Sequence, residues 1–108
     1  MMPAAPIIMF LGDAKYSFAL TATLVLELET KCGAIGALAN RIFSRNFGQS
    51  DLHEVIRLAL IGGGTSSKRA AEIIAAYVAD RPLVETYPIA ANIIERVWFG
   101  APHEVANG

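Results

Sequence analysis

The sequence predicts a mainly α fold in which a small N-terminal β-hairpin is followed by a bundle of about four or five helices. Two observations support this fold class. After residue 20, apolar residues recur at helical spacing in several segments, so each segment would present one apolar stripe. Before residue 20, two short segments that contain isoleucine, tyrosine and phenylalanine flank a turn with a glycine, which is typical of a hairpin.

The chain of 108 residues is expected to form a single domain spanning 1–108. Its ends, 1–6 and 103–108, are expected to be mobile tails. A domain of this size has a modest core, to which a partner protein can add burial.

The first predicted element is a hairpin that turns at Gly12-Asp13-Ala14-Lys15. Pairing Leu11 with Tyr16 across this turn collects apolar side chains on one face, which is expected to be buried. An isolated hairpin is marginal in water, so it must pack on a helix, and its outer edges are open to another strand. The residues of the predicted buried face are Ile7, Met9, Leu11, Tyr16, Phe18 and Leu20.

Two helices are predicted next. Thr21 or Thr23 is expected to cap a helix that runs from Leu24 to Lys31 and closes at Gly33. A second helix follows, with Arg41 and Arg45 on its solvent side and Asn46-Phe47-Gly48 at its end. Its apolar positions are Ile35, Leu38, Ala39, Ile42 and Phe43.

The third predicted helix spans Asp51–Ile61 and leads into three glycines. Ser50 is the expected N-cap, and Asp51 and Glu54 place negative charge in the first turn. Gly62 is expected to end the helix in the left-handed conformation, and the next residues form a flexible joint into a helix capped by a hydroxyl. The apolar stripe of the third helix consists of Leu52, Val55, Ile56, Ala59 and Leu60.

The last two helices are predicted from the same spacing. One is expected to end near Asp80-Arg81-Pro82, because the residue before a proline avoids the α conformation. Leu83–Tyr87 is expected to form one turn that breaks or kinks at Pro88 before the final helix, which Gly100 and Pro102 stop. Core packing explains the aromatic residues of both helices. The two stripes are Ala70, Ile73, Ile74, Tyr77 and Val78, then Ile89, Ile93, Ile94, Val97 and Trp98, with Tyr87 before Pro88.

The composition favours association with other proteins. Hydrophobic residues make up 54% of the chain and the mean hydropathy is +0.42, yet charges interrupt every apolar stretch before the ~20 residues of a membrane span. The head lacks the basic segment of a secretory signal, so the protein is expected in the cytoplasm. A net charge of −1 gives no general attraction to nucleic acid or membranes. The apolar surplus instead indicates contact with another protein or with a second copy.

The sequence contains no recognisable catalytic, cofactor-binding or metal-binding constellation. The single cysteine, Cys32, excludes an internal disulfide and is expected to be a buried or half-buried structural thiol. His53 and His103 are far apart in the sequence and neither has a positioned partner. The segment Gly62–Gly64 follows a predicted helix rather than a strand, so it does not fit a phosphate-binding loop. We therefore expect no enzyme activity, no cofactor and no metal.

A DNA-binding helix-turn-helix is an alternative interpretation. Asp51–Ile61, the glycine joint and Ser66–Asp80 have the required order, with Lys68 and Arg69 at the start of the second helix. Against it, the chain is slightly acidic and that helix offers few side chains able to read bases.

Several segments occur in a distinctive order: Phe18 and Leu20 in the hairpin, Leu26–Glu29 before Gly33, Arg57–Gly64, Tyr77-Val78 before Pro82-Leu83, and Ala90, Ile93, Ile94 and Gly100. This order resembles the gene transfer agent product-ten family, over roughly Phe10 to Gly100. Members are small phage-tail proteins of prophage-like particles, labelled as tail tube proteins or tail assembly chaperones. Ala14, where the family commonly has a turn glycine, and the proline-rich head depart from the pattern.

The resemblance implies a non-enzymatic role in tail assembly. Tail assembly chaperones are thought to keep the long tape-measure protein soluble in the cytoplasm while tail-tube subunits polymerise around it. The expected partners are therefore a tape-measure protein, a tail-tube subunit or both, with a homo-oligomer as a further expectation and neither membrane nor nucleic acid as a partner. The rival role within the same system is a structural tail subunit that stays in the particle.

Overall fold

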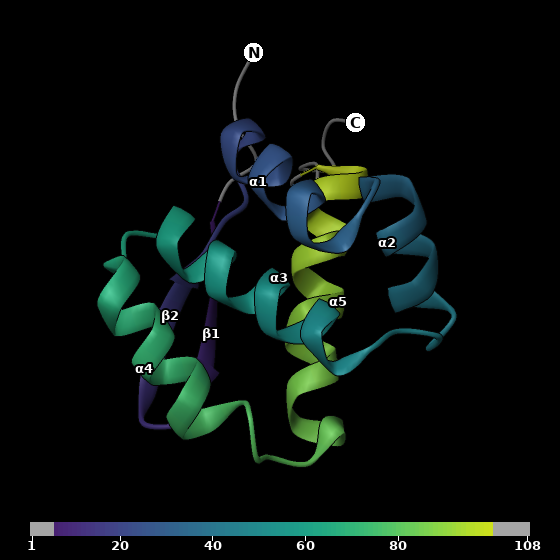
Figure 1. The fold of residues 1–108 in the computed structure, drawn as a ribbon. Helices are drawn as coiled ribbons and strands as arrows, with labels where there is room; N and C mark the ends of the chain where they lie inside the picture. The colour runs from purple at the N-terminus through teal and green to yellow at the C-terminus, as the bar shows by residue number, and fades with distance from the viewer. Residues whose placement is uncertain (1–5, 101–108) are drawn as a thin grey trace, which may run out of the picture.

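The structure is a computed structural model that describes residues 6–100. A two-stranded antiparallel hairpin precedes five helices, which confirms the predicted fold class (Figure 1). The predicted tails, 1–6 and 103–108, lie outside the described residues except for Pro6. The elements are β1 (Ile7–Leu11), β2 (Ala14–Phe18), α1 (Ala22–Cys32), α2 (Ile35–Phe43), α3 (Gln49–Gly62), α4 (Ser67–Tyr77) and α5 (Leu83–Phe99).

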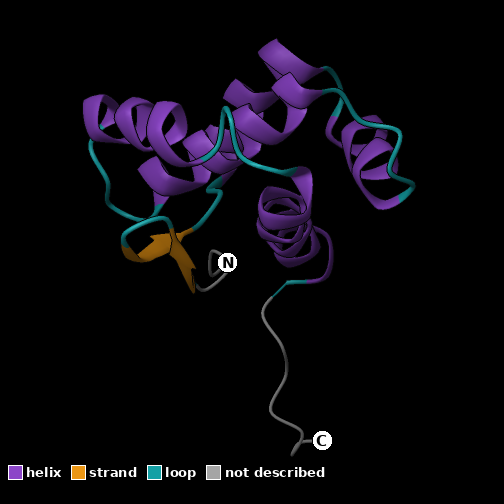
Figure 2. Cartoon of the chain, turned by 90° about the horizontal axis from the view of Figure 1, so that it is seen from below, coloured by secondary structure: helices purple, strands orange, loops and turns teal. Residues whose placement is uncertain are grey.

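Helix α3 is the centre of the fold. It packs against α1, α4, α5 and strand β2, and in Figure 1 it crosses between α4 on one side and α5 on the other. Seen from below in Figure 2, the hairpin lies beside α5, the last helix of the chain. Within the described part of the chain, no helix is long and apolar enough to cross a membrane.

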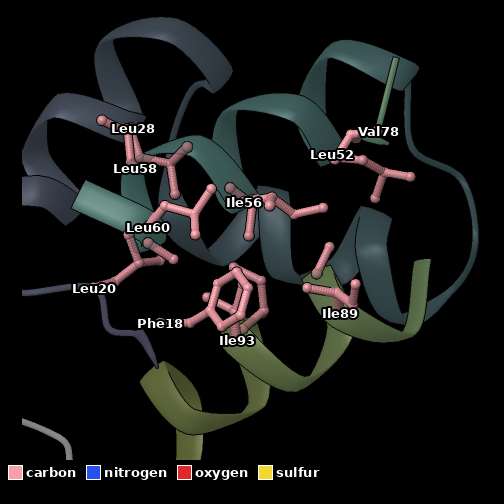
Figure 3. Packing of buried hydrophobic residues seen from close by; sticks show 14 of the residues in the cluster. Phe18, Leu20, Leu28, Leu52, Ile56, Leu58, Leu60, Val78, Ile89 and Ile93 are labelled. Atoms are coloured by element: carbon pink, nitrogen blue, oxygen red, sulfur yellow. The ribbon is translucent and has the colours of Figure 1, made fainter. Parts of the chain in front are cut away.

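The buried part of α3 is wider than its predicted apolar stripe. Leu58 lies off that stripe and is fully buried, because α1 packs on this side and places Leu28 next to it (Figure 3). Across the core, Phe18 of β2 lies against Ile93 of α5. A helix covered on several sides needs apolar residues around most of its circumference. The predicted stripe itself is confirmed as buried: Leu52, Val55, Ile56, Ala59 and Leu60.

The hairpin turns more tightly than predicted. Leu11 pairs with Ala14 rather than with Tyr16, and Gly12 opens a two-residue turn at a φ of 70°. Glycine adopts this positive φ without strain. A side chain at Gly12 would also overlap the ring of Tyr77 in α4. The register differs from the predicted one by two residues, which leaves every side chain on its predicted face.

Three predicted helix ends are confirmed. Thr21 Oγ1 accepts a hydrogen bond from the Leu24 N–H at 3.2 Å and caps α1. Gly33, with a φ of 84°, closes the same helix. Ser66 Oγ accepts from the Arg69 N–H at 3.1 Å and caps α4. Each of these ends depends on residues within one turn of the helix, so local sequence was sufficient to predict it.

The predicted ends of α3 are wrong. Gly48 is the N-cap, and its N–H donates to the Asp51 carboxylate at 2.9 Å, while Ser50 lies inside the helix. Gly62 is the last helical residue and does not adopt a positive φ, which occurs instead at Gly64 with a φ of 111°. An acidic side chain at the third helical position therefore replaces the predicted serine cap.

Gly62 and Gly63 are required for a close approach between segments. A Cβ at Gly62 would overlap the Ala19 carbonyl oxygen, and a Cβ at Gly63 would overlap the Ser17 carbonyl oxygen. The Ala19 N–H donates to the Ala59 carbonyl at 3.0 Å, which fastens the chain after β2 to the last turns of α3. The glycines thus allow the end of α3 to lie directly on the backbone of the hairpin.

Helix α4 ends earlier than the position of Pro82 led us to predict. The last helical residue is Tyr77 rather than one near Asp80. The Ala79 N–H donates to the Ile74 carbonyl at 2.8 Å, and the Ala79 carbonyl accepts from Gln49 Nε2 of α3 at 3.1 Å. A side chain from a different helix therefore helps to fix where α4 stops.

Helix α5 is continuous, so the predicted break at Pro88 is wrong. Proline at this position removes a single backbone hydrogen bond, the one to the Val84 carbonyl. The buried face of α5 packs against α3 and α2 on both sides of the proline, and this packing holds the helix together. Tyr77 and Tyr87 are half-buried, as their spacing predicted, whereas Trp98 is 55% exposed and does not belong to the core.

Candidate protein-interaction surface

A polar cluster joins α1, α2 and α3. Arg41 of α2 donates to both carboxylate oxygens of Asp51 in α3, at 2.9 Å from Nη2 and 3.2 Å from Nε. Its Nη2 also donates to the Cys32 carbonyl at the end of α1, at 2.9 Å. The prediction that Arg41 faces solvent is wrong, whereas Arg45 is exposed as predicted. A charged pair that satisfies two helix ends in this way is a structural joint.

The thiol of Cys32 lies beside this cluster and is half-buried, as predicted. Burial raises its pKa to about 11, and the nearby Asp51 carboxylate acts in the same direction. At pH 8 we expect roughly 100-fold less thiolate than in an ordinary cysteine, so iodoacetamide should label the folded protein far more slowly than the protein in urea. Because Cys32 is the only cysteine, mass spectrometry reads the labelling directly. Equal rates in both states would contradict the buried position.

Among residues 6–100, no group of three or more His, Cys, Asp and Glu side chains is placed to hold a metal ion. His53 is half-buried on α3, and His103 lies outside the described residues.

Of the two basic side chains that the DNA-binding alternative requires, Arg69 makes contacts within the protein. Arg69 Nη2 lies 3.5 Å from the Asp13 carboxylate and donates to Tyr16 Oη at 3.3 Å, both in the hairpin. Glu72 lies 3.5 Å from the same guanidinium. Two carboxylates beside Arg69 repel a phosphate, so Lys68 is the remaining exposed cation at the start of α4.

Large apolar side chains are exposed in three places around the hairpin and α5. One pair lies on the outer face of β1, one at the start of α5 and one at its end; Leu26 and Phe43 are exposed elsewhere. Paired exposure of this kind marks an interaction surface more often than scattered single residues do. The three pairs are Ile8 and Phe10, Leu83 and Val84, and Trp98 and Phe99.

Two grooves separate β1 from α5. Groove A, of about 390 Å³, lies between the first half of β1 and the end of α5 and is lined by Ile7, Met9, Asn92, Glu95, Arg96, Phe99 and Gly100. Groove B, of about 640 Å³, lies between the turn of the hairpin, the end of α4 and the start of α5. Its lining residues are Phe10, Leu11, Gly12, Ala76, Tyr77, Arg81, Glu85, Thr86 and Ile89.

A single contact divides these grooves, because Asn92 Nδ2 donates to Met9 Sδ at 3.7 Å. Along β1 the lining changes from groove A to groove B after Met9, and along α5 it changes before Asn92. The two grooves therefore follow one another along the same side of β1.

A third groove, groove C, lies at the start of α5 and has a volume of about 490 Å³. Phe47 stacks on Tyr87 with ring centroids 5.3 Å apart, and the Arg45 guanidinium lies 5.7 Å from the Tyr87 ring centre. The Tyr87 hydroxyl donates to the Ile42 carbonyl at 2.8 Å, which fixes this wall. Groove C is lined by Arg45, Phe47, Leu83, Val84, Tyr87 and Pro88.

The sequence predicted an apolar surplus but not its position. One signal was present in β1, where five apolar residues occur consecutively from Ile7 to Leu11. Since successive side chains of a strand point to opposite faces, a hairpin with one buried face must expose every second residue of this run. The exposed positions Ile8 and Phe10 could thus have been identified from the sequence, whereas Trp98 and Val84 could not.

The comparisons with known proteins identify one family. A family model described as "Phage tail tube protein, GTA-gp10" matches residues 5–100. The curated proteins and the solved structures that were searched contain no match to the chain.

Proposed function

Because this chain belongs to the GTA-gp10 family of phage tail tube proteins, we propose that it acts as a tail assembly chaperone, which binds a tape-measure or tail-tube protein in the cytoplasm. The role needs no catalysis. It requires apolar surface that stays exposed in the free protein and is covered when the partner binds.

The observation that carries the proposal is the exposure of large apolar side chains on the outer face of β1 and at both ends of α5. Val84 is 80% exposed and Phe99 is 73% exposed, and each borders a groove that also has charged residues in its wall. An apolar centre with a polar rim is the usual composition of a protein-binding surface. A helix or strand of a tail protein would find both shape and apolar contact there.

We expect co-expressed tape-measure or tail-tube protein to co-purify with this chain at low and at high salt. Burial of apolar surface is little screened by ions, whereas binding to DNA phosphates weakens steeply between ~50 and 200 mM salt. Val84→Glu and Trp98→Glu should each reduce capture, because they place a charge in the apolar surface. Ala71→Glu adds the same charge on the exposed side of α4 and should leave capture unchanged.

Two results would overturn this proposal. Salt-sensitive retention of a DNA fragment without capture of a tail protein would favour the helix-turn-helix alternative. Stoichiometric amounts of the chain in purified particles would favour a structural tail subunit, because a chaperone leaves the tail when assembly is complete.

A further inference from the structure

We propose that the free edge of β1 accepts an extended segment of the tail partner as a third strand, whose side chains enter grooves A and B. The proposal rests on the proposed function for the identity of the partner. It adds which surface of this chain binds the partner and which conformation the bound segment of the partner adopts.

The two edges of the hairpin differ in how far other segments cover them. On the β2 edge, Gly62 at the end of α3 and the following Gly63 lie against the backbone of Ala19 and Ser17, and Lys15 adds a charge. Among residues 6–100, no segment is hydrogen-bonded to the β1 edge, whose strand consists of apolar residues alone. Soluble proteins usually protect an edge strand with lysine, proline, a bulge or a covering segment. Among the described residues of β1, none of these devices is present.

The register of the hairpin shows which backbone groups point outward. Leu11 and Ala14 close the two-residue turn, and Met9 pairs with Tyr16, so the hydrogen-bonding groups of Leu11 and Met9 point toward β2. The alternate residues of β1, Ile8 and Phe10, therefore direct their N–H and C=O groups away from β2. Within the part of the chain that the structure describes, neither residue makes a backbone hydrogen bond outside the hairpin.

These groups define the chemistry of the occupant. Two N–H and two C=O groups spaced along one strand edge match an extended polypeptide, which offers the same groups at the same spacing. The exposed side chains of Ile8 and Phe10 add apolar contact on the outer face of the enlarged sheet.

Grooves A and B account for the inner face of the added strand. Both lie between β1 and α5 and succeed one another along the strand, on either side of the contact between Met9 and Asn92. Side chains at alternate positions of a third strand would point between the sheet and α5. The volumes of about 390 and 640 Å³ are many times the roughly 30 Å³ that a water molecule occupies. The grooves therefore have room for whole side chains. Their walls combine apolar residues with charged ones, Glu95 and Arg96 in groove A and Arg81 and Glu85 in groove B, so side chains with an apolar stem and a polar end fit both grooves.

A single segment suits this site better than a second copy of the chain. In each copy α5 lies beside β1 (Figure 2). If two copies paired through β1, the α5 helix of each copy and the helices packed on it would have to fit beside the β1 edge and the grooves of the other copy. A segment that is extended before it binds brings no such bulk.

Amide hydrogen exchange in the co-purified complex tests the proposal directly. In the free protein the Ile8 and Phe10 amides should exchange quickly, and in the complex with the tape-measure or tail-tube protein each should slow by at least about tenfold, as a newly hydrogen-bonded amide does. The Met9 amide, which already faces β2, serves as the internal control. Unchanged exchange at Ile8 and Phe10 in a formed complex would overturn the strand addition.

Substitutions at Phe10 separate backbone pairing from side-chain contact. Phe10→Pro removes the outward N–H but none of the hydrogen bonds to β2, and it should weaken capture about tenfold beyond Phe10→Ala. Leu26→Ala removes an equally exposed apolar side chain on α1 and should have no effect. Equal capture by the proline and alanine variants would contradict strand addition. If Phe10→Pro does not fold, the exchange measurement on the unmodified chain decides.

The outcomes also distinguish this inference from the proposed function. Capture of a tail protein without protection of Ile8 and Phe10 would refute the strand addition and leave the chaperone role intact. Protection that appears in the isolated chain as its concentration rises would identify a second copy as the occupant and refute the inference. Failure to capture either tail protein would refute the proposed function itself.

Discussion

Replacing Gly62 with alanine is expected to lower the free energy of unfolding by about 1 to 3 kcal/mol, although alanine is the better helix former. The added Cβ would overlap the Ala19 carbonyl oxygen. That carbonyl cannot move away easily, because the Ala19 N–H is bonded to the Ala59 carbonyl at 3.0 Å. Relief of the overlap requires the hairpin to separate from α3. Gly62→Val should be worse still, since its side chain is larger and β-branched.

Gly36 provides the matched control. It lies inside α2, and nothing lies within 4 Å of the position that its Cβ would occupy. Gly36→Ala should therefore stabilise the protein by about 0.5 to 1 kcal/mol, because alanine loses less conformational entropy on folding. Urea denaturation of the three variants measures these differences. Stabilisation by Gly62→Ala would show that the close approach is absent.

Replacing Asp51 with asparagine is expected to cost about 2 kcal/mol at pH 7. The carboxylate is the partner of Arg41 and also accepts the Gly48 N–H at the start of α3. An amide keeps the shape but removes the charge and one acceptor, which leaves the Arg41 guanidinium without its counter-ion. The loss is moderate rather than extreme because the Arg41 side chain retains 31% exposure and part of its hydration.

The cost of Asp51→Asn should depend on pH. Burial alone would raise the pKa of Asp51, but hydrogen bonds from Arg41 and Gly48 outweigh it and hold the pKa below the usual value of 3.8. Stability from a carboxylate with a depressed pKa is present above its unfolded pKa and is lost as the pH falls through the folded value. The difference between wild type and variant should therefore shrink below pH 4.

Asp80→Asn is the control for this experiment. Asp80 is exposed, and its substitution changes the net charge by the same amount. Its effect on the urea midpoint should stay within ±0.5 kcal/mol at every pH. A similar loss in both variants would mean that net charge, rather than the joint between α1, α2 and α3, determines the effect.

The position of the proposed binding surface could be predicted from the sequence only in part. The hydrophobic content predicted an apolar surplus, and the consecutive apolar residues of β1 contained the information that one of its faces is exposed. No pattern along the chain indicated that only the β1 edge stays open, because the cover of the β2 edge comes from glycines more than forty residues away. Exposure of Val84 and Trp98 likewise depends on which side of α5 meets α3 and α2.

By itself, the sequence determined the features that depend on neighbours within one or two turns of the chain. Most positions of the helical stripes, the caps at Thr21 and Ser66, the closure at Gly33 and the buried face of the hairpin follow from spacing and local hydrogen bonding. Phe43 and Trp98 are stripe positions that the fold leaves exposed. A shift of two residues in the hairpin register did not alter that face, since strand side chains repeat with a period of two.

Only the tertiary structure decided the features that depend on contacts between distant segments. Gly62 is glycine because another backbone approaches it, and Arg41 is held by a carboxylate ten residues away. Pro88 stays within a helix because packing on both sides outweighs one missing hydrogen bond. The physical reason is common to all three. Steric exclusion, charge pairing and burial act over a few ångströms in space, and distances this short between distant segments are set only when the chain folds.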